Sequence, residues 1–283
     1  MTSEAAINRL KSTKGFVFDM DGTLILGDKK NNNMQTLPGA PDFINLLIEN
    51  NIPYVVMTNG TARSPAAYVG VLSEAGIPMD ANTMMTPSSV AAIYLKEHGY
   101  KRIMVMGCPG VYEPLQDLGL EVVLSSEENP GPVDAVYIGW YREFGFKDIE
   151  NAWIACKDGA ELFTASDVPF FASANGPAIG TSCALAAALK PLTGKDAIVL
   201  GKPSVYAIEA AANHLGLKVE DIAVVGDDAN LEVPMAKDNG ALAIYVHTGT
   251  GGPNAFDDRP ESTWPDISVA NVGELVALYR DGQ

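Results

Sequence analysis

The feature that most constrains the fold is an alternation of apolar runs with helix-like stretches along the whole chain. Buried strands that alternate with helices are typical of a parallel or mixed sheet covered by helices. We therefore predict an α/β fold with a Rossmann-like, doubly wound parallel-sheet core. Strand-like runs cover residues 15–20, 52–60, 101–107, 120–125, 133–140, 195–203, 221–229 and 241–246.

Helix-like stretches fill the intervals between these runs. In 37–51, for example, Pro and Gly open the stretch and apolar residues recur on one face, which predicts a helix. The stretch 181–189 begins with Thr181, which is a good N-cap residue. The other predicted helices cover 64–76, 90–98, 148–157 and 204–215.

The charge balance excludes two classes of partner. The chain has 35 acidic against 19 basic residues and a formal net charge of −16. Nucleic acid and anionic membrane surfaces both require a basic patch, so we expect neither as a partner. A small anionic substrate stays compatible with this charge, because one pocket can be locally positive.

Cysteine and histidine usage gives the expected compartment and argues against zinc. The three cysteines have no CxxC spacing, and this favours a reducing, cytoplasmic setting. The three histidines lie far apart in the sequence, whereas zinc sites favour clustered ligands. The N-terminus lacks the apolar segment of a signal peptide, and no apolar run approaches the ~20 residues that span a bilayer.

Polar residues follow four of the predicted strands, at the point where each apolar run ends. Asp19, Thr58, Lys202 and Asp227 occupy these positions. In doubly wound sheets, ligands bind outside the carboxyl ends of the strands. If the four strand ends converge, these residues form one site.

The residue types fit phosphoryl transfer. A carboxylate such as Asp19 can attack a phosphoryl group and form an aspartyl-phosphate that water then hydrolyses. Because a phosphate dianion repels a carboxylate, a cation must lie between them, and Mg²⁺ suits oxygen ligands and phosphate. We predict that Asp19, the main-chain carbonyl of Asp21 and Asp227 hold Mg²⁺.

The remaining polar residues complete this chemistry. The Asp21 side chain can protonate the leaving oxygen and later activate water. Thr58, the N–H of Asn59 and Lys202 can bind the phosphoryl oxygens and offset their charge. Taken singly, each residue also has a structural interpretation as a turn former, a helix cap or a surface lysine. Four of them in this order, each after a buried strand, favour the functional interpretation.

Four short segments carry a resemblance to a known family. DMDGTL (19–24), TNG (58–60), GKP (201–203) and GDD (226–228) resemble, in order, the four motifs of haloacid dehalogenase-type phosphatases. The resemblance covers nearly the whole chain. LPGAPDF (37–43) and the continuation of TNG as TNGTARS are similar to the subgroup of NagD-type nucleotide phosphatases and 4-nitrophenyl phosphatases.

The resemblance implies a two-domain enzyme with an inserted cap. The expected catalytic core comprises 1–85 and 190–283, and the expected α/β cap comprises 86–189. It also implies a Mg²⁺ cofactor, a small phosphorylated metabolite as substrate and a homodimer formed through the cap. IGWYREFGF (138–146) resembles the cap signature of the subgroup, which places Arg142 among the substrate-binding residues, with a structural ion pair as the alternative role.

The chain departs from the family pattern at a few positions. Glu232 stands where the fourth motif usually carries a second aspartate, so either Glu232 or Asp228 completes the metal site. In the cap, Tyr141 replaces a frequent Asp, and SANG (173–176) replaces a TNPD stretch.

We also expect the loop 169–182 to face the leaving group, and the alternative is that this segment only packs inside the cap. It has no Lys or Arg and offers Ser173 and Asn175 for hydrogen bonds. It therefore favours neutral leaving groups such as nucleosides, sugars, polyols or aryl alcohols over leaving groups with a second phosphate. The substrate-binding set predicted from the sequence is thus Thr58, Asn59, Gly60, Arg142, Ser173, Asn175 and Lys202.

Two alternatives belong to other functional classes. A phospho-accepting signalling domain also uses an aspartate at a strand end, but it lacks a large cap and the second Asp of the DxD pair. A catalytically silent metabolite-binding protein could retain the core as a scaffold, but it should have lost Asp19 or Lys202, and both are present. Steady turnover of a phosphate ester separates these alternatives from a phosphatase.

Overall fold

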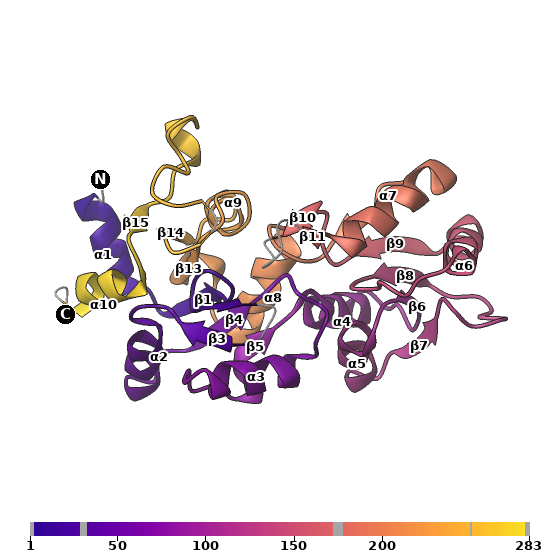
Figure 1. Ribbon diagram of the computed structural model, residues 1–283, viewed down its shortest axis with the longest axis horizontal. Helices are drawn as coiled ribbons and strands as arrows, with labels where there is room; N and C mark the ends of the chain where they lie inside the picture. Colours follow the sequence, from indigo (N-terminus) through magenta and orange to yellow (C-terminus); the bar gives the residue numbers. More distant parts are fainter. Residues whose placement is uncertain (1–2, 29–32, 172–177, 250, 281–283) are drawn as a thin grey trace. The chain divides into compact units, whose positions relative to one another are not determined.

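The chain divides into two compact units. The computed structural model describes residues 3–28, 33–171, 178–249 and 251–280 (Figure 1). The first unit consists of residues 1–58, 68–85 and 208–283, and the second unit consists of residues 59–67 and 86–207. The second unit contains the whole range 86–189, which the family resemblance predicts to be a cap.

The first unit is built on a six-stranded parallel sheet with the order β15-β14-β13-β1-β4-β5. Its strands are β1 (Gly15–Asp19), β4 (Tyr54–Met57), β5 (Met84–Met85), β13 (Ile222–Gly226), β14 (Leu242–Val246) and β15 (Ile267–Val269). A short antiparallel pair, β2 (Ile25–Asp28) and β3 (Asn33–Thr36), follows β1.

Helices account for most of the remaining described residues of the first unit. They are α1 (Glu4–Ser12), α2 (Ala40–Glu49), most of α3 (Pro65–Glu74), most of α8 (Val205–Leu215), α9 (Glu232–Asp238) and α10 (Val272–Arg280), with short 3₁₀ turns η1 (Ala81–Thr83), η2 (Val219–Asp221) and η3 (Glu261–Thr263). The helix α10 contacts both α1 and α2 (Figure 1).

An aromatic cluster fixes β1 against two of these helices. Phe16 and Phe18 alternate with Val17 along β1 and therefore point to the same face of the sheet. There they meet Phe43 of α2 and Tyr279 of α10, with ring centroids 5.1–5.8 Å apart. Because β1 ends in Asp19, this packing also fixes the position of that carboxylate.

The second unit has its own parallel sheet of five strands with the order β12-β9-β8-β6-β7. Its strands are β6 (Arg102–Met106), β7 (Glu121–Leu124), β8 (Ala135–Ile138), β9 (Glu161–Thr164) and β12 (Ile198–Val199), and its antiparallel pair is β10 (Phe170–Phe171) with β11 (Ala178–Ile179). Its helices are α4 (Pro87–Glu97), α5 (Pro109–Asp117), α6 (Phe146–Lys157) and α7 (Thr181–Thr193). Parallel sheets with helices in both units confirm the predicted α/β class.

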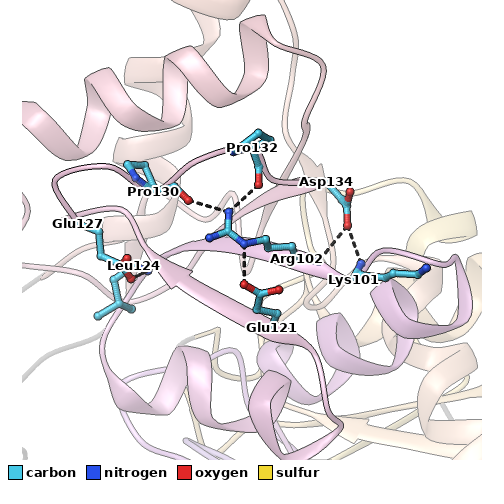
Figure 2. A network of polar contacts seen from close by, with 8 residues as sticks. All are labelled: Lys101, Arg102, Glu121, Leu124, Glu127, Pro130, Pro132 and Asp134. Carbon is cyan, nitrogen blue, oxygen red and sulfur yellow. Dashed lines mark hydrogen bonds and ion pairs between the residues drawn. The ribbon is translucent and has the colours of Figure 1, made fainter.

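A polar network ties the amino ends of β6, β7 and β8 together in the second unit (Figure 2). The Arg102 guanidinium contacts Glu121 at 2.7 Å and donates to the carbonyls of Pro130 and Pro132 at 2.7 and 2.6 Å. Asp134 accepts the backbone N–H groups of Lys101 and Arg102 at 2.8 and 2.9 Å. These hydrogen bonds hold the pKa of the Asp134 carboxyl below its ordinary value.

One predicted helix cap is wrong. The N-cap of α7 is Gly180, and Thr181 is the first residue of the helix. The Thr181 hydroxyl instead accepts the N–H of Tyr141 at 3.4 Å.

Among the helices that the structure describes, none combines the length and the apolar character needed to cross a lipid bilayer.

Candidate active site

The site of the first unit lies at the carboxyl edge of three adjacent strands. Asp19 is the last residue of β1, Thr58 follows β4 directly and Asp227 follows β13 directly. In register, Phe18 pairs with Val225 and Asp19 pairs with Met57. Since parallel strands all end at the same edge of a sheet, the fold brings these three residues together.

Two carboxylates of this edge are buried and lie around one hydroxyl group. Asp19 and Asp227 are 8% and 4% exposed, and Thr23 is fully buried between them. The Thr23 hydroxyl donates to Asp19 Oδ2 at 3.2 Å and lies 3.5 Å from Asp227 Oδ1. Two like charges this close repel each other in a poorly solvated place, so a cation suits this position.

The turn after β1 separates Asp21 from this buried pair. The carbonyl of Met20 accepts the N–H groups of Leu24 and Ile25 at 3.0 and 3.1 Å, which closes a tight turn. Asp21 lies on the outside of the turn and is exposed. The two acids of the DxD pair therefore occupy different environments, one buried and one accessible to a reacting group.

Two glycines make room for the Asp227 carboxylate. A Cβ on Gly22, whose φ is +94°, would lie 2.6 Å from Asp227 Oδ2. A Cβ on Gly249, in the loop after β14, would lie only 1.6 Å from the same atom. The next residue back, Thr248, donates its hydroxyl to the carbonyl of Gly22 at 2.5 Å. Thr23, Thr248 and Gly249 are not among the site residues predicted from the sequence, although HTGTGG (247–252) directly follows a buried strand.

The acids that follow Asp227 are engaged in organising the loop. Asp228 accepts the N–H of Asn230 at 2.7 Å, and its own N–H donates to Glu232 Oε2 at 3.1 Å. Glu232 is 2% exposed, and a Cβ on Gly226 would lie 2.2 Å from its Cγ. The Glu232 carboxylate is thus folded back onto the main chain of the loop.

The donor set of this edge fits Mg²⁺. Within the described part of the chain, no three His, Cys, Asp or Glu side chains form a metal-binding group. Mg²⁺ does not need such a group, because it is commonly held by one or two carboxylates together with waters and substrate phosphate. Asp19 and Asp227, with a main-chain carbonyl from the turn after β1, supply that kind of site.

The acids of this edge also affect a buried tyrosine. Burial, together with the negative charges of Asp227 and Asp228, raises the pKa of Tyr245 in β14 to about 12. The Tyr245 hydroxyl donates to the carbonyl of Gly252 at 3.0 Å. This tyrosine therefore stays protonated and fixes the loop after β14.

Lys202 belongs to the second unit, because it follows β12 and β12 pairs with β9. Lys202 is 1% exposed, which rules out a solvated surface lysine. Asn59 fixes its backbone by two reciprocal hydrogen bonds of 2.9 Å, from the side-chain amide to the Lys202 carbonyl and from the Lys202 N–H to Asn59 Oδ1. A Cβ on Gly201 would lie 2.7 Å from Asn59 Oδ1, so the glycine of GKP permits this contact. The side chain of Asn59 thus joins the TNG and GKP segments. The sequence predicted a role only for the backbone N–H of Asn59.

The structure gives Tyr141 a structural contact inside the second unit. Its hydroxyl donates to Asp148 at 3.3 Å, and Ser125 donates to the same carboxylate at 2.6 Å. Asp148 also accepts the N–H of Gly145 at the start of α6. Burial and the charge of Asp148 raise the pKa of the Tyr141 hydroxyl.

The structure describes Arg142 and Gly60 among the remaining predicted substrate contacts. Arg142 is exposed, and its guanidinium lies 6.0 Å from the ring centroid of Trp140. Gly60 follows Asn59 in the second unit. Ser173 and Asn175 lie outside the described residues.

Two family models and several known proteins match this chain. A family model described as haloacid dehalogenase-like hydrolase matches residues 16–121, and a second haloacid dehalogenase-like model matches residues 199–275. The chain is 26% identical to the sugar-phosphatase AraL of Bacillus subtilis, over 96% of this chain and 95% of the relative.

Solved structures resemble the chain over nearly its whole length. The 4-nitrophenylphosphatase of Thermotoga maritima has a TM-score of 0.84 at 27% identity, with 96% of this chain and 99% of that chain covered. NagD from Escherichia coli has a TM-score of 0.81 at 21% identity, with 93% and 98% covered, and this likeness shows the fold alone. The resemblance that the four motifs predicted is confirmed.

Proposed function

The chain belongs to the haloacid dehalogenase-like hydrolases and is a phosphoric monoester hydrolase, and from this premise we propose that it hydrolyses small phosphomonoesters with Mg²⁺ through an aspartyl-phosphate. The observation that carries the proposal is the buried pair Asp19 and Asp227 around one hydroxyl, at the carboxyl edge of the sheet. Two close carboxylates favour a cation, and a cation lets a carboxylate approach a phosphate dianion.

Asp19 is the proposed nucleophile. Its carboxylate oxygen attacks phosphorus, a bond forms between that oxygen and phosphorus, and the bond from phosphorus to the leaving oxygen breaks. Asp21, which is exposed beside it, gives its proton to the leaving oxygen. In the second step Asp21 takes a proton from water, the water oxygen bonds to phosphorus, and Asp19 is released as a carboxylate.

Asp19, the carbonyl of Asp21 and Asp227 are the proposed Mg²⁺ ligands. When bound, the ion offsets the negative charge of the phosphoryl oxygens and lowers their repulsion of the nucleophile. Asp228 and Glu232 contribute indirectly, because both hold the backbone of the loop that presents Asp227.

Thr58, Asn59, Gly60 and Lys202 are the proposed phosphate-binding residues. Hydroxyl, backbone N–H and ammonium groups stabilise the charge that develops on the equatorial oxygens. The reciprocal hydrogen bonds between Asn59 and Lys202 support a common role for the TNG and GKP segments.

The proposed substrates are phosphate esters of sugars, aryl alcohols, nucleosides or polyols. Support comes from the relatives named as a sugar-phosphatase and a 4-nitrophenylphosphatase. Arg142, Ser173 and Asn175 are the proposed contacts to the leaving group. We also propose a cytoplasmic setting, supported by three free cysteines, and a homodimer formed through the cap.

The decisive experiment measures phosphate release from 4-nitrophenyl phosphate and from a hexose phosphate, with Mg²⁺ and with EDTA. Steady Mg²⁺-dependent turnover of either ester is expected. A single burst of phosphorylation without turnover would indicate the phospho-accepting alternative, and ester binding without any reaction would indicate the silent alternative.

Two variants separate the roles of the acids. Asp21→Asn should slow turnover and leave Mg²⁺ binding intact, because only its carbonyl is proposed to touch the metal. Asp227→Asn should weaken Mg²⁺ binding itself, as isothermal titration calorimetry can measure. Equal losses of Mg²⁺ affinity in both variants would contradict this division of roles.

A further inference from the structure

A long excursion between β14 and β15 reaches the loop that carries Asp227. The excursion, residues 251–266, contains η3 and contacts α9 beside that loop (Figure 1). Its base is fixed to β14, because the Tyr245 hydroxyl donates to the carbonyl of Gly252 and the Tyr245 ring meets Phe256 at 5.0 Å. The excursion therefore has a rigid attachment to the same strand whose end provides Gly249.

Arg259 links this excursion to the loop 227–230. Its guanidinium donates to the carbonyl of Ala229 at 3.1 Å and to Asn230 Oδ1 at 2.9 Å. The guanidinium also lies 5.7 Å from the ring centroid of Phe256. On the other side, the Arg259 carbonyl accepts the indole N–H of Trp264 at 3.0 Å. Contacts to the main chain and to the side chain of Arg259 thus fix this residue, and its guanidinium in turn fixes the loop.

The contact continues through the loop towards the metal site. The N–H of Asn230, whose side chain Arg259 binds, donates to Asp228 at 2.7 Å. The N–H of Asp228 then donates to Glu232 at 3.1 Å. Arg259 and Glu232 therefore hold the segment after Asp227 from two sides, and Arg259 lies outside the four motifs.

We propose that Arg259 is a positioning residue of the metal site, which fixes the loop 227–230 so that the Asp227 carboxylate is presented correctly to Mg²⁺. The proposal rests on the proposed function, because it assumes that Asp227 binds the ion. A residue that orients a metal ligand through hydrogen bonds typically changes metal affinity when it is replaced.

The positive charge of Arg259 and its two hydrogen bonds predict opposite effects on the affinity for Mg²⁺. A positive charge near Asp227 and Asp228 repels a cation, so its removal alone would tighten Mg²⁺ binding. Loss of the two hydrogen bonds would let the loop move and would weaken binding. Because Arg259 is only half-buried, water screens its charge, and we expect the positional effect to be larger.

Isothermal titration calorimetry with MgCl₂ on the whole protein tests the proposal without an activity assay. Arg259→Gln should raise the dissociation constant of Mg²⁺ by about tenfold or more. Arg259→Lys should weaken binding as well, because lysine keeps the charge but has no planar fork to bridge two acceptors. At saturating Mg²⁺, the turnover rate should return close to the wild-type value in both variants.

Lys237→Gln is the matched control. Lys237 carries the same charge in the same unit, and its ion pair at 3.2 Å is with Asp266 and not with a residue of the loop 227–230. Its removal should leave the Mg²⁺ dissociation constant within about twofold of wild type, since partly exposed ion pairs have small and local effects. An equal weakening in the control would reduce the Arg259 effect to general destabilisation and overturn the proposal.

The other outcomes are equally informative. Tighter or unchanged Mg²⁺ binding in Arg259→Gln would overturn the positioning role. If Asp227→Asn abolishes Mg²⁺ binding while Arg259→Gln does not affect it, only the present inference fails. If wild type and Asp227→Asn bind Mg²⁺ equally, the proposed function fails first, and the inference falls with it.

Discussion

Two sheet edges of this protein carry clustered acids, and the groups that surround these acids differ between the two edges. At the carboxyl edge of the first unit, buried Asp19 and Asp227 lie around the hydroxyl of Thr23. At the amino edge of the second unit, Asp134 accepts two backbone N–H groups and Glu121 contacts the Arg102 guanidinium (Figure 2). Both edges belong to parallel sheets, so topology alone does not account for the difference.

The groups that surround an acid decide whether it stabilises the fold or contributes to a binding site. Asp134 accepts backbone N–H groups that lower its pKa, so ionising this acid stabilises the folded state, and Glu121 contacts the Arg102 guanidinium. Asp19 and Asp227 lie around the Thr23 hydroxyl, close to each other in a poorly solvated place, so their arrangement favours a cation between them. Substitutions at the two edges should therefore change different measurable quantities.

The largest effect is expected for Asp19→Asn. The substitution keeps the shape of the side chain but removes the nucleophilic charge, so kcat/KM should fall by more than about 10³-fold. The free energy of unfolding should change far less than the activity, because the amide keeps the shape of the side chain and its oxygen can still accept the Thr23 hydroxyl. Phosphate release and urea unfolding measure the two quantities. Near-normal turnover would contradict the proposed aspartyl-phosphate mechanism.

The next effect is expected for Gly249→Ala. A methyl group at this position would lie 1.6 Å from Asp227 Oδ2, so the carboxylate or the loop must move. Mg²⁺ affinity should fall by about 10- to 100-fold, which calorimetry can measure. Gly70→Ala is the matched control, since no atom lies within 4 Å of its added Cβ and α3 favours alanine. Unchanged Mg²⁺ affinity in Gly249→Ala would show that the loop adapts freely.

Arg102→Ala tests the amino edge of the sheet in the second unit. The variant loses donors to the carbonyls of Pro130 and Pro132 and to Glu121, so the free energy of unfolding should fall by about 1–3 kcal/mol. The rate at which the enzyme hydrolyses saturating 4-nitrophenyl phosphate should not change. Lys218→Ala removes a lysine from the exposed pair with Glu220 at 3.5 Å and should cost close to nothing. A loss of activity as large as the loss in Asp19→Asn would erase the distinction between the edges.

Sequence reasoning reached the α/β class and the family because short-range signals carry them. Apolar runs define the strands, and Asp19, Thr58 and Asp227 lie directly at strand ends, where parallel topology brings them together. The contacts of Thr23 and Gly249 with Asp227 could not be predicted, since they join residues far apart in the chain. The fold-back of Glu232 onto Asp228 depends on rotamer and loop geometry, which spacing does not encode.

Local rules also failed where tertiary contacts compete with them. Thr181 has a side chain suited to an N-cap, but its hydroxyl accepts the N–H of Tyr141, and Gly180 occupies the cap position. Lys202 follows an apolar run, yet that strand pairs with β9 in the sheet of the second unit. Strand pairing is decided by packing over the whole chain, and a single sequence does not show which sheet a short strand joins.

The smallest expected effect concerns the pH dependence of stability at Asp134. Its folded pKa is lowered from the ordinary value of 3.8, because the carboxylate accepts the N–H groups of Lys101 and Arg102. A lowered folded pKa gives stability that is present above the unfolded pKa and is lost as the pH falls through the folded value. The Asp134 contribution should therefore be complete at neutral pH and fade below about pH 4.

Asp134→Asn tests this expectation, since the amide keeps the shape of the acceptor but not its charge. In urea unfolding, the variant should be less stable than wild type at pH 7, and the two proteins should approach each other near pH 3. Asp117→Asn, at the exposed end of α5, is the control and should track wild type at both pH values. A difference between Asp134→Asn and wild type that stayed constant with pH would assign the loss to shape rather than charge. The pairing of Asp134 would then no longer contrast with the close charges of Asp19 and Asp227.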